Sequence, residues 1–156
     1  MKFFSLIFLL SIFLSCAQPA GKQKDADGNY KERIALMEAD KQFSEMSVQK
    51  GMREAFIEFI DSNGVLLRPN HMPIVGAHAI DYLIQHNDNG FVMKWQPHHA
   101  VVSESADLGY TYGVWAITPS EVDTVLYGTY VSIWRRQQDG SWKFVLDSGN
   151  EGIGTQ

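Results

Sequence analysis

The sequence contains almost no cysteine and few basic residues. Cys16 is its single cysteine, so disulfides within the chain cannot stabilise the fold and a packed core must do so. Lysine and arginine together number 13 against 18 aspartates and glutamates, which gives a formal net charge of −5. Nucleic acids and anionic lipid surfaces select for basic patches. The composition therefore predicts that nucleic acid is not a partner.

A hydrophobic run long enough to span a membrane is also missing. Residues 3–14 are apolar except for two serines, whereas a spanning helix needs about 20 apolar residues. A short apolar run after Lys2 is typical of a secretory signal peptide. Cys16 follows directly, as in a bacterial lipobox, which predicts removal of residues 1–15 and acylation of the thiol. The alternative is ordinary secretion with cleavage near Ala17 or Ala20.

These features predict an exported lipoprotein of the bacterial cell envelope, periplasmic or outer-membrane, that is held at a membrane by a lipid on Cys16. Residues 16–29 are small, polar and punctuated by glycine and proline, which favours a flexible tether. Residues 30–156 then form the folded domain, and that length is sufficient for a real core.

Metal-binding and nucleophile motifs are absent as well. His98 and His99 are adjacent in a predicted strand and point to opposite faces, while His78 and His86 lie two helical turns apart. No serine lies in a Gly-x-Ser-x-Gly turn and no glycine loop precedes a helix in the manner of a phosphate site. We therefore expect neither a metal nor a cofactor.

Helical patterns come first and strand patterns follow. Residues 30–50 carry an apolar stripe with Asp40 inside it, and Asn29 with Glu32 has the spacing of a capping box. Further segments are a short helix at 55–60, a turn at 61–64, a strand at 65–68, a loop at 69–76, a helix at 77–87, and strands at 92–103, 108–117, 124–137 and 141–148. This order predicts an α+β domain with helices on one face of a curved antiparallel sheet.

Four stretches resemble the nuclear transport factor 2-like superfamily, in an uncharacterised branch of its SnoaL-like and ketosteroid-isomerase-like proteins. They are EADKQFSEMSVQKGMREAF, VLLRPNHMPIVG, DLGYTYGVW and GTYVSIWRRQQDGSWKFVLDSGN. The resemblance runs from about residue 34 to residue 150. It implies a cystatin-like cone in which the sheet wraps around the first helices and an internal pocket, and a possible homodimer through the outer sheet face.

The resemblance does not extend to the catalytic groups of the steroid isomerases. Those enzymes place an aspartate before a proline at the end of the first strand, a tyrosine in the first helix and a second acid on a later strand. The corresponding positions here are Arg68, Phe43 and the region of Gly128. All three differences remove proton-transfer groups, so we expect no isomerase chemistry of that kind.

Arg68 is a permanent cation at the end of an apolar strand, and three interpretations of it remain open. It could pair with Asp40, since neither charge tolerates burial alone. It could hold a carboxylate or phosphate of a ligand with its planar fork. It could also lie in solvent.

Strand alternation supplies the other candidate site residues. The face of Gly128, Tyr130, Ser132 and Trp134, with Leu126, alternates small and aromatic side chains and is assigned to the cavity. In the last strand, superfamily spacing places Asp147 toward the cavity, whereas periodicity alone would turn Trp142, Phe144 and Leu146 inward. The remaining ligand-binding candidates are Asp40, Trp95, Tyr110 and Tyr112, and His98 is a candidate pocket base.

Three functional hypotheses follow. The first is a binding domain for a small, partly apolar organic ligand, with Arg68, Tyr130 and Asp147 as polar anchors. The second is a SnoaL-like enzyme of the isomerase, cyclase or hydrolase type in which Asp147 is the general acid–base. The third is association through an outer sheet face that carries Trp115, Tyr127 and Ile133.

Overall fold

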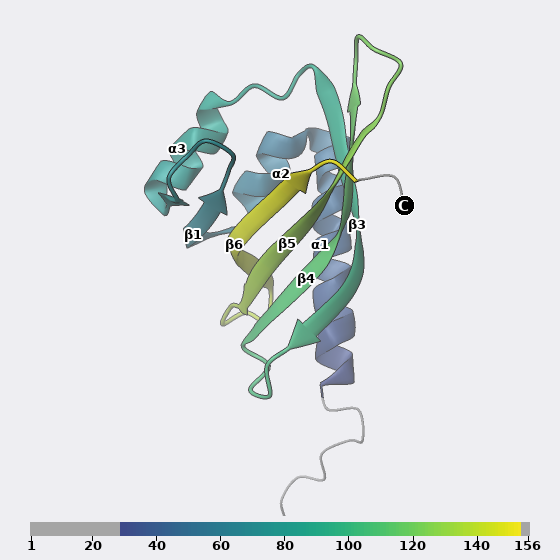
Figure 1. Ribbon diagram of the computed structural model, residues 1–156. Helices are drawn as coiled ribbons and strands as arrows, with labels where there is room; N and C mark the ends of the chain where they lie inside the picture. Colours follow the sequence, from purple (N-terminus) through teal and green to yellow (C-terminus); the bar gives the residue numbers. More distant parts are fainter. Residues whose placement is uncertain (1–28, 154–156) are drawn as a thin grey trace, which may run out of the picture.

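The computed structural model describes residues 29–153, which form three helices and a curved six-stranded sheet (Figure 1). The helices and strands in chain order are α1 Tyr30–Lys50, α2 Met52–Phe59, β1 Ile60–Leu67, β2 Ile74–Val75, α3 Ala77–Gln85, β3 Phe91–Val102, β4 Leu108–Pro119, β5 Leu126–Arg136 and β6 Trp142–Glu151. The predicted α+β class is confirmed. The predicted signal segment and Cys16 lie outside the described residues.

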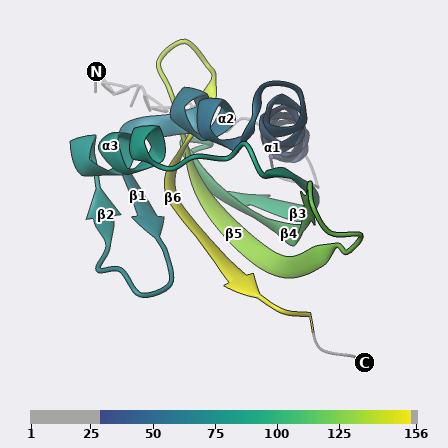
Figure 2. The ribbon, with the colours of Figure 1, turned by 90° about the horizontal axis from the view of Figure 1, so that it is seen from above.

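The sheet has the strand order β2-β1-β6-β5-β4-β3 and does not close into a barrel. Strands β3 to β6 follow one another as antiparallel neighbours, whereas β1 pairs with β6 in parallel. The predicted curved antiparallel sheet is confirmed, and β1 joins it through one parallel pair. Figure 2 shows the three helices on the same side of the curved sheet. In residues 29–153 no helix combines the length and apolarity needed to cross a membrane.

Helix α1 covers the free edge of strand β3. The Ser44 hydroxyl donates to the carbonyl of Trp95 at 2.8 Å and accepts from the Trp95 N–H at 2.8 Å, and the Ser47 hydroxyl donates to the Met93 carbonyl at 2.7 Å. An uncovered edge strand leaves its backbone groups unpaired. The two buried serines on the apolar stripe of α1 therefore provide hydrogen-bond partners for the backbone of β3.

The core is an aromatic cluster built around Phe43 of α1. Its ring lies 4.7 Å from that of Phe56, 4.5 Å from that of Trp95 and 5.4 Å from that of Phe144, measured between centroids. Aromatic pairs in such edge and offset geometries add to the stabilisation from burial. These contacts join helices α1 and α2 to strands β3 and β6, so the core ties the β3 edge and an interior strand of the curved sheet to the helices.

Local expectations were wrong at two points. Asn29 has a φ of 71° and its side chain donates to the Ser103 carbonyl, so no capping box forms. Residues 61–64, expected as a turn, are part of β1, whose pairing with β6 changes register between Ile60 and Val65. The hairpin at 138–140 is confirmed, with Gly140 at a φ of 89°.

Gly128 of β5 lies directly opposite Trp115 of β4 and provides the space for the indole ring. A Cβ at position 128 would lie 2.2 Å from Cζ2 of Trp115 and 2.1 Å from the backbone oxygen of Asn150. The glycine therefore allows a large side chain to fold over the inner face of the sheet.

We predict that Gly128→Ala lowers the free energy of unfolding by roughly 2 kcal/mol or more, because neither a strand backbone nor a packed indole can yield easily. Gly90→Ala is the matched control, since a Cβ there would meet no atom within 4 Å. Chemical denaturation of both variants measures the effect. Equal stability of the two would contradict the packing described here.

Candidate functional site

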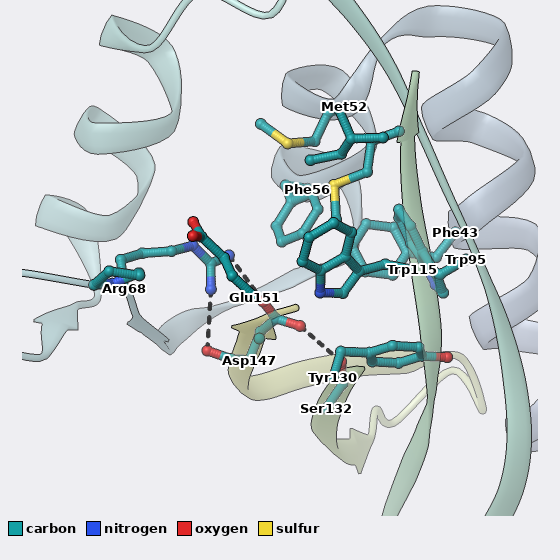
Figure 3. Close-up of a pocket in the computed structure, with 14 residues that line it drawn as sticks. Phe43, Met52, Phe56, Arg68, Trp95, Trp115, Tyr130, Ser132, Asp147 and Glu151 are labelled. Carbon is teal, nitrogen blue, oxygen red and sulfur yellow. Dashed lines mark hydrogen bonds and ion pairs between the residues drawn. The ribbon is translucent and has the colours of Figure 1, made fainter. Parts of the chain in front are cut away.

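The concave side of the sheet and helices α1 and α2 enclose a cavity of about 180 Å³ (Figure 3). Most of its wall is aromatic or aliphatic, and its polar groups lie mainly on β5, β6 and the end of β1. The lining residues are Phe43, Met52, Phe56, Arg68, Pro69, Met93, Trp95, Trp115, Ile117, Tyr130, Ser132, Asp147, Gly149 and Glu151.

The polar side of the cavity is built around Asp147. Its Oδ1 lies 2.8 Å from Nη2 of Arg68, and its Oδ2 accepts a hydrogen bond of 2.8 Å from the Ser132 hydroxyl. Nη1 of Arg68 also donates to the backbone oxygens of Leu67 and Asp147, at 3.1 and 3.3 Å. The Arg68 guanidinium lies over the Phe56 ring, 5.4 Å from its centroid. Both terminal nitrogens of Arg68 thus have partners in the protein.

Of the three interpretations left open for Arg68, this geometry corresponds to the internal ion pair, but the partner is Asp147 and not Asp40. In the parallel pair β1–β6, Leu66 lies opposite Asp147, so Arg68 follows directly beyond that point and reaches the carboxylate. The partner was not predictable from periodicity, because it depends on which strand lies beside β1.

A β-bulge in β6 brings Asp147 into the cavity. Ile133 pairs with Leu146 but Trp134 pairs with Phe144, so Val145 is the extra residue. A bulge shifts the alternation of inward and outward side chains along a strand. Phe144 therefore faces the core before the bulge and Asp147 faces the cavity after it. The alternation of apolar residues thus predicted the orientation of Phe144 correctly, and superfamily spacing predicted that of Asp147.

Asp40 lies behind the aromatic wall and has no exposed surface. Its Oδ1 accepts from the indole N–H of Trp95 at 2.8 Å and its Oδ2 from the hydroxyl of Tyr130 at 2.7 Å. Thr111 supplies a further hydrogen bond and itself accepts from the indole of Trp134 at 2.8 Å. Among residues 29–153, Asp40 forms no ion pair.

Burial raises the pKa of Asp40 from 3.8 to about 6, although the hydrogen bonds from Tyr130, Trp95 and Thr111 oppose the shift. The pKa of Tyr130 is raised strongly, first by burial and then by the negative charge of Asp40. Tyr130 is therefore a neutral donor at any ordinary pH. Asp40 is the buried group in this network that can change charge near neutrality.

Four of the ligand-binding candidates line the cavity together, as expected from the sequence: Arg68, Trp95, Tyr130 and Asp147. Tyr110 and Tyr112 do not, because they lie on the outer face of β4 with 42% and 45% of their surface exposed. His98 is exposed beside an irregularity of β3.

Trp115 was expected on the outer face with Tyr127 and Ile133, but it lines the cavity. Alternation along β4 turns Tyr110 and Tyr112 outward and Thr111, Gly113 and Trp115 inward. The same pattern in the sequence could have predicted that Trp115 faces the cavity. Tyr127 is half exposed on the outer face. Within the described part of the chain, no three His, Cys, Asp or Glu residues lie close enough to hold a metal ion.

Comparison with known proteins places the fold. No family model and no curated protein sequence matches the chain. A ketosteroid isomerase-like protein from Erwinia carotovora atroseptica superimposes with a TM-score of 0.63 at 17% identity, over 80% of this chain and 99% of the other. An NTF2-like protein with a cystatin-like fold from Novosphingobium aromaticivorans gives 0.63 at 17% identity, over 80% and 84%.

A candidate scytalone dehydratase from the same organism gives a TM-score of 0.64 at 15% identity, over 81% of this chain and 88% of the other. The chain therefore has the nuclear transport factor 2-like, cystatin-like fold. The superpositions establish the fold. At identities this low they do not establish the chemistry, which depends on the residues of the site.

The buried carboxylate of Asp40 gives a pH-dependent stability with a definite sign. The unfolded chain releases this proton near pH 3.8, whereas the folded chain holds it until about pH 6. Its contribution to the free energy of unfolding therefore falls as the pH rises through this window, by about 3 kcal/mol, and is constant above it.

Asp40→Asn cannot titrate, so the stability of the wild type relative to this variant should decrease by most of that amount between pH 4 and pH 7. Urea denaturation at several pH values measures the difference, in which the other carboxylates cancel. Asp123→Asn, at an exposed position, should run parallel to the wild type. A stability difference between the wild type and Asp40→Asn that does not change with pH would contradict the shifted pKa.

Removing Arg68 should leave Asp147 buried without its cation. We expect Arg68→Met to lower the free energy of unfolding by roughly 2–3 kcal/mol, below the range for a fully buried pair because 20% of the Arg68 side chain is exposed. Adding Asp147→Asn should recover at least half of the loss. Arg136→Met, which breaks a more exposed pair with Glu32, should cost less than about 1 kcal/mol. Equal losses for the two arginines would refute the proposed role of the Arg68 pair.

Proposed function

We propose that this domain binds a small, partly apolar organic molecule in the cavity between α1, α2 and the sheet. The observation that carries the proposal is the aromatic wall together with a single polar side at Arg68, Asp147 and Ser132. Cavities with mostly apolar walls and a few placed polar groups are typical of ligand sites.

The size of the cavity limits the ligand. An apolar cavity of about 150 Å³ in another protein binds benzene. At about 180 Å³, the cavity here suits one ring with a small polar substituent. The apolar part of such a ligand would lie against Phe43 and Phe56, and its polar substituent would face the side that carries Tyr130, Ser132 and Asp147.

Acid–base catalysis by Asp147 is favoured less by the geometry, although the carboxylate does face the cavity. Arg68 engages one carboxylate oxygen and Ser132 the other, so the group is held as a hydrogen-bond acceptor rather than poised to move a proton. His98 is exposed and does not lie among the cavity residues. The binding proposal accordingly includes no turnover.

The sequence adds a location to this proposal. We propose an exported domain that the lipid on Cys16 holds at the bacterial envelope, with the ligand drawn from that compartment. The binding proposal rests on residues 29–153 and does not depend on the anchor.

Filling the cavity should abolish binding. We expect benzyl alcohol, used as a ring-sized probe, to bind the wild type, and Met52→Trp to weaken that binding at least tenfold because the indole would occupy the site. Met72→Trp is the matched control, since Met72 is 84% exposed and does not line the cavity. Isothermal titration and ligand-observed NMR measure both. Absence of binding to the wild type, or equal binding to both variants, would refute the proposal.

A further inference from the structure

The polar hydrogens of the three polar aromatic residues in the cavity wall are all held by the protein. Trp95 and Tyr130 donate to Asp40, and the Trp115 indole donates to the Thr129 carbonyl at 3.2 Å. These residues therefore offer a ligand no free polar hydrogen and would contact it through their rings. The face of an aromatic ring carries negative electrostatic potential and attracts cations.

Asp40 strengthens this potential on two of the rings. A carboxylate that accepts from an indole N–H and a phenol O–H pushes electron density into both π-systems, since hydrogen bonds polarise the groups they join. Asp40 has no cationic partner among the described residues and no contact with solvent. Its charge thus acts on the cavity through Trp95 and Tyr130.

The charges around the cavity do not balance. Among residues 29–153, Asp147 and Glu151 line it against Arg68 alone, and Asp40 lies just behind the wall. Arg68 is committed to Asp147 and to two backbone oxygens. The net charge of these four groups is −2 when all are ionised, which opposes an anionic ligand and leaves a deficit of positive charge.

The wall already accommodates one cation. The Arg68 guanidinium lies 5.4 Å from the Phe56 centroid, at the polar side of the cavity. A second cation farther along the wall would meet Trp95, Trp115 and Tyr130. Aromatic walls of this kind recognise substituted ammonium groups.

We propose that the ligand of this cavity is a small organic cation, an amine or a quaternary ammonium compound, and that Asp40 is a positioning residue that sets the orientation and the negative potential of its aromatic walls. This inference rests on the proposed binding function and deepens it. It also gives a physical reason for an uncompensated carboxylate in the core, because the bound cation supplies the missing charge.

Three probes of equal ring size test the charge preference: benzylammonium, benzyl alcohol and benzoate, titrated into the protein at pH 8, where Asp40 is ionised. We expect benzylammonium to bind at least threefold tighter than benzyl alcohol and benzoate at least tenfold weaker, from the strength of cation–π contacts of this type. Benzyl alcohol binding without a preference for benzylammonium would overturn this inference and leave the binding function standing. No binding by any probe would overturn both.

Asp40→Asn separates the charge from the shape of the site. The Asn side chain can still accept from Trp95 and donate to the Tyr130 oxygen, so the rings should stay in place. We expect it to weaken benzylammonium roughly threefold to tenfold and to change benzyl alcohol less than twofold. An equal loss for both probes would show that Asp40 acts only through the structure, and would refute its electrostatic role.

Glu151→Gln tests the second unbalanced charge. It should also lower the affinity for benzylammonium selectively, whereas Glu121→Gln, at an exposed position away from the cavity, should not. Comparable effects of the two substitutions, or none from Glu151→Gln, would count against a site for cations.

Discussion

The hydrogen bonds around the buried carboxylate of Asp40 are the constraint on which the architecture of the site depends. They join helix α1 to three strands, through Trp95 on β3, Thr111 on β4 and Tyr130 on β5. A buried carboxylate without a cation is costly, and every donor that satisfies it must stay in place. The same contacts that stabilise Asp40 therefore fix two walls of the cavity.

The second carboxylate of the site is stabilised differently. Asp147 has a guanidinium partner and a hydroxyl donor, and it lies on β6 at the side of the cavity next to β1. Asp147 is thus stabilised by an ion pair, whereas Asp40 is stabilised only by hydrogen bonds from neutral donors. This difference gives the cavity its electrostatic character, because the compensated acid contributes little field while the uncompensated acid polarises the aromatic rings it contacts.

The fold is shared with a ketosteroid isomerase-like protein and a candidate scytalone dehydratase. The resemblance seen in the sequence implies that Phe43, Arg68 and the region of Gly128 correspond to the catalytic positions of the steroid isomerases. Phe43 lies at the centre of the aromatic core, Arg68 is held by Asp147, and Gly128 makes room for Trp115. Each of the three has a structural role of its own here. A shared scaffold does not by itself give a shared function, because function depends on the residues of the site.

The helices, the four long strands and the inward face of β5 could be predicted from the amino-acid sequence, because they depend on local periodicity. Four residues that meet at the cavity were also candidates from the sequence: Arg68, Trp95, Tyr130 and Asp147, the last from superfamily spacing and against the periodicity of its own strand. Three further features became visible only in the folded chain. Arg68 pairs with Asp147, and the bulge at Val145 turns Asp147 inward. Ser44 and Ser47 form hydrogen bonds with the backbone of the edge strand β3. Those contacts join segments far apart in the chain, and they depend on strand neighbours and register, which periodicity does not encode.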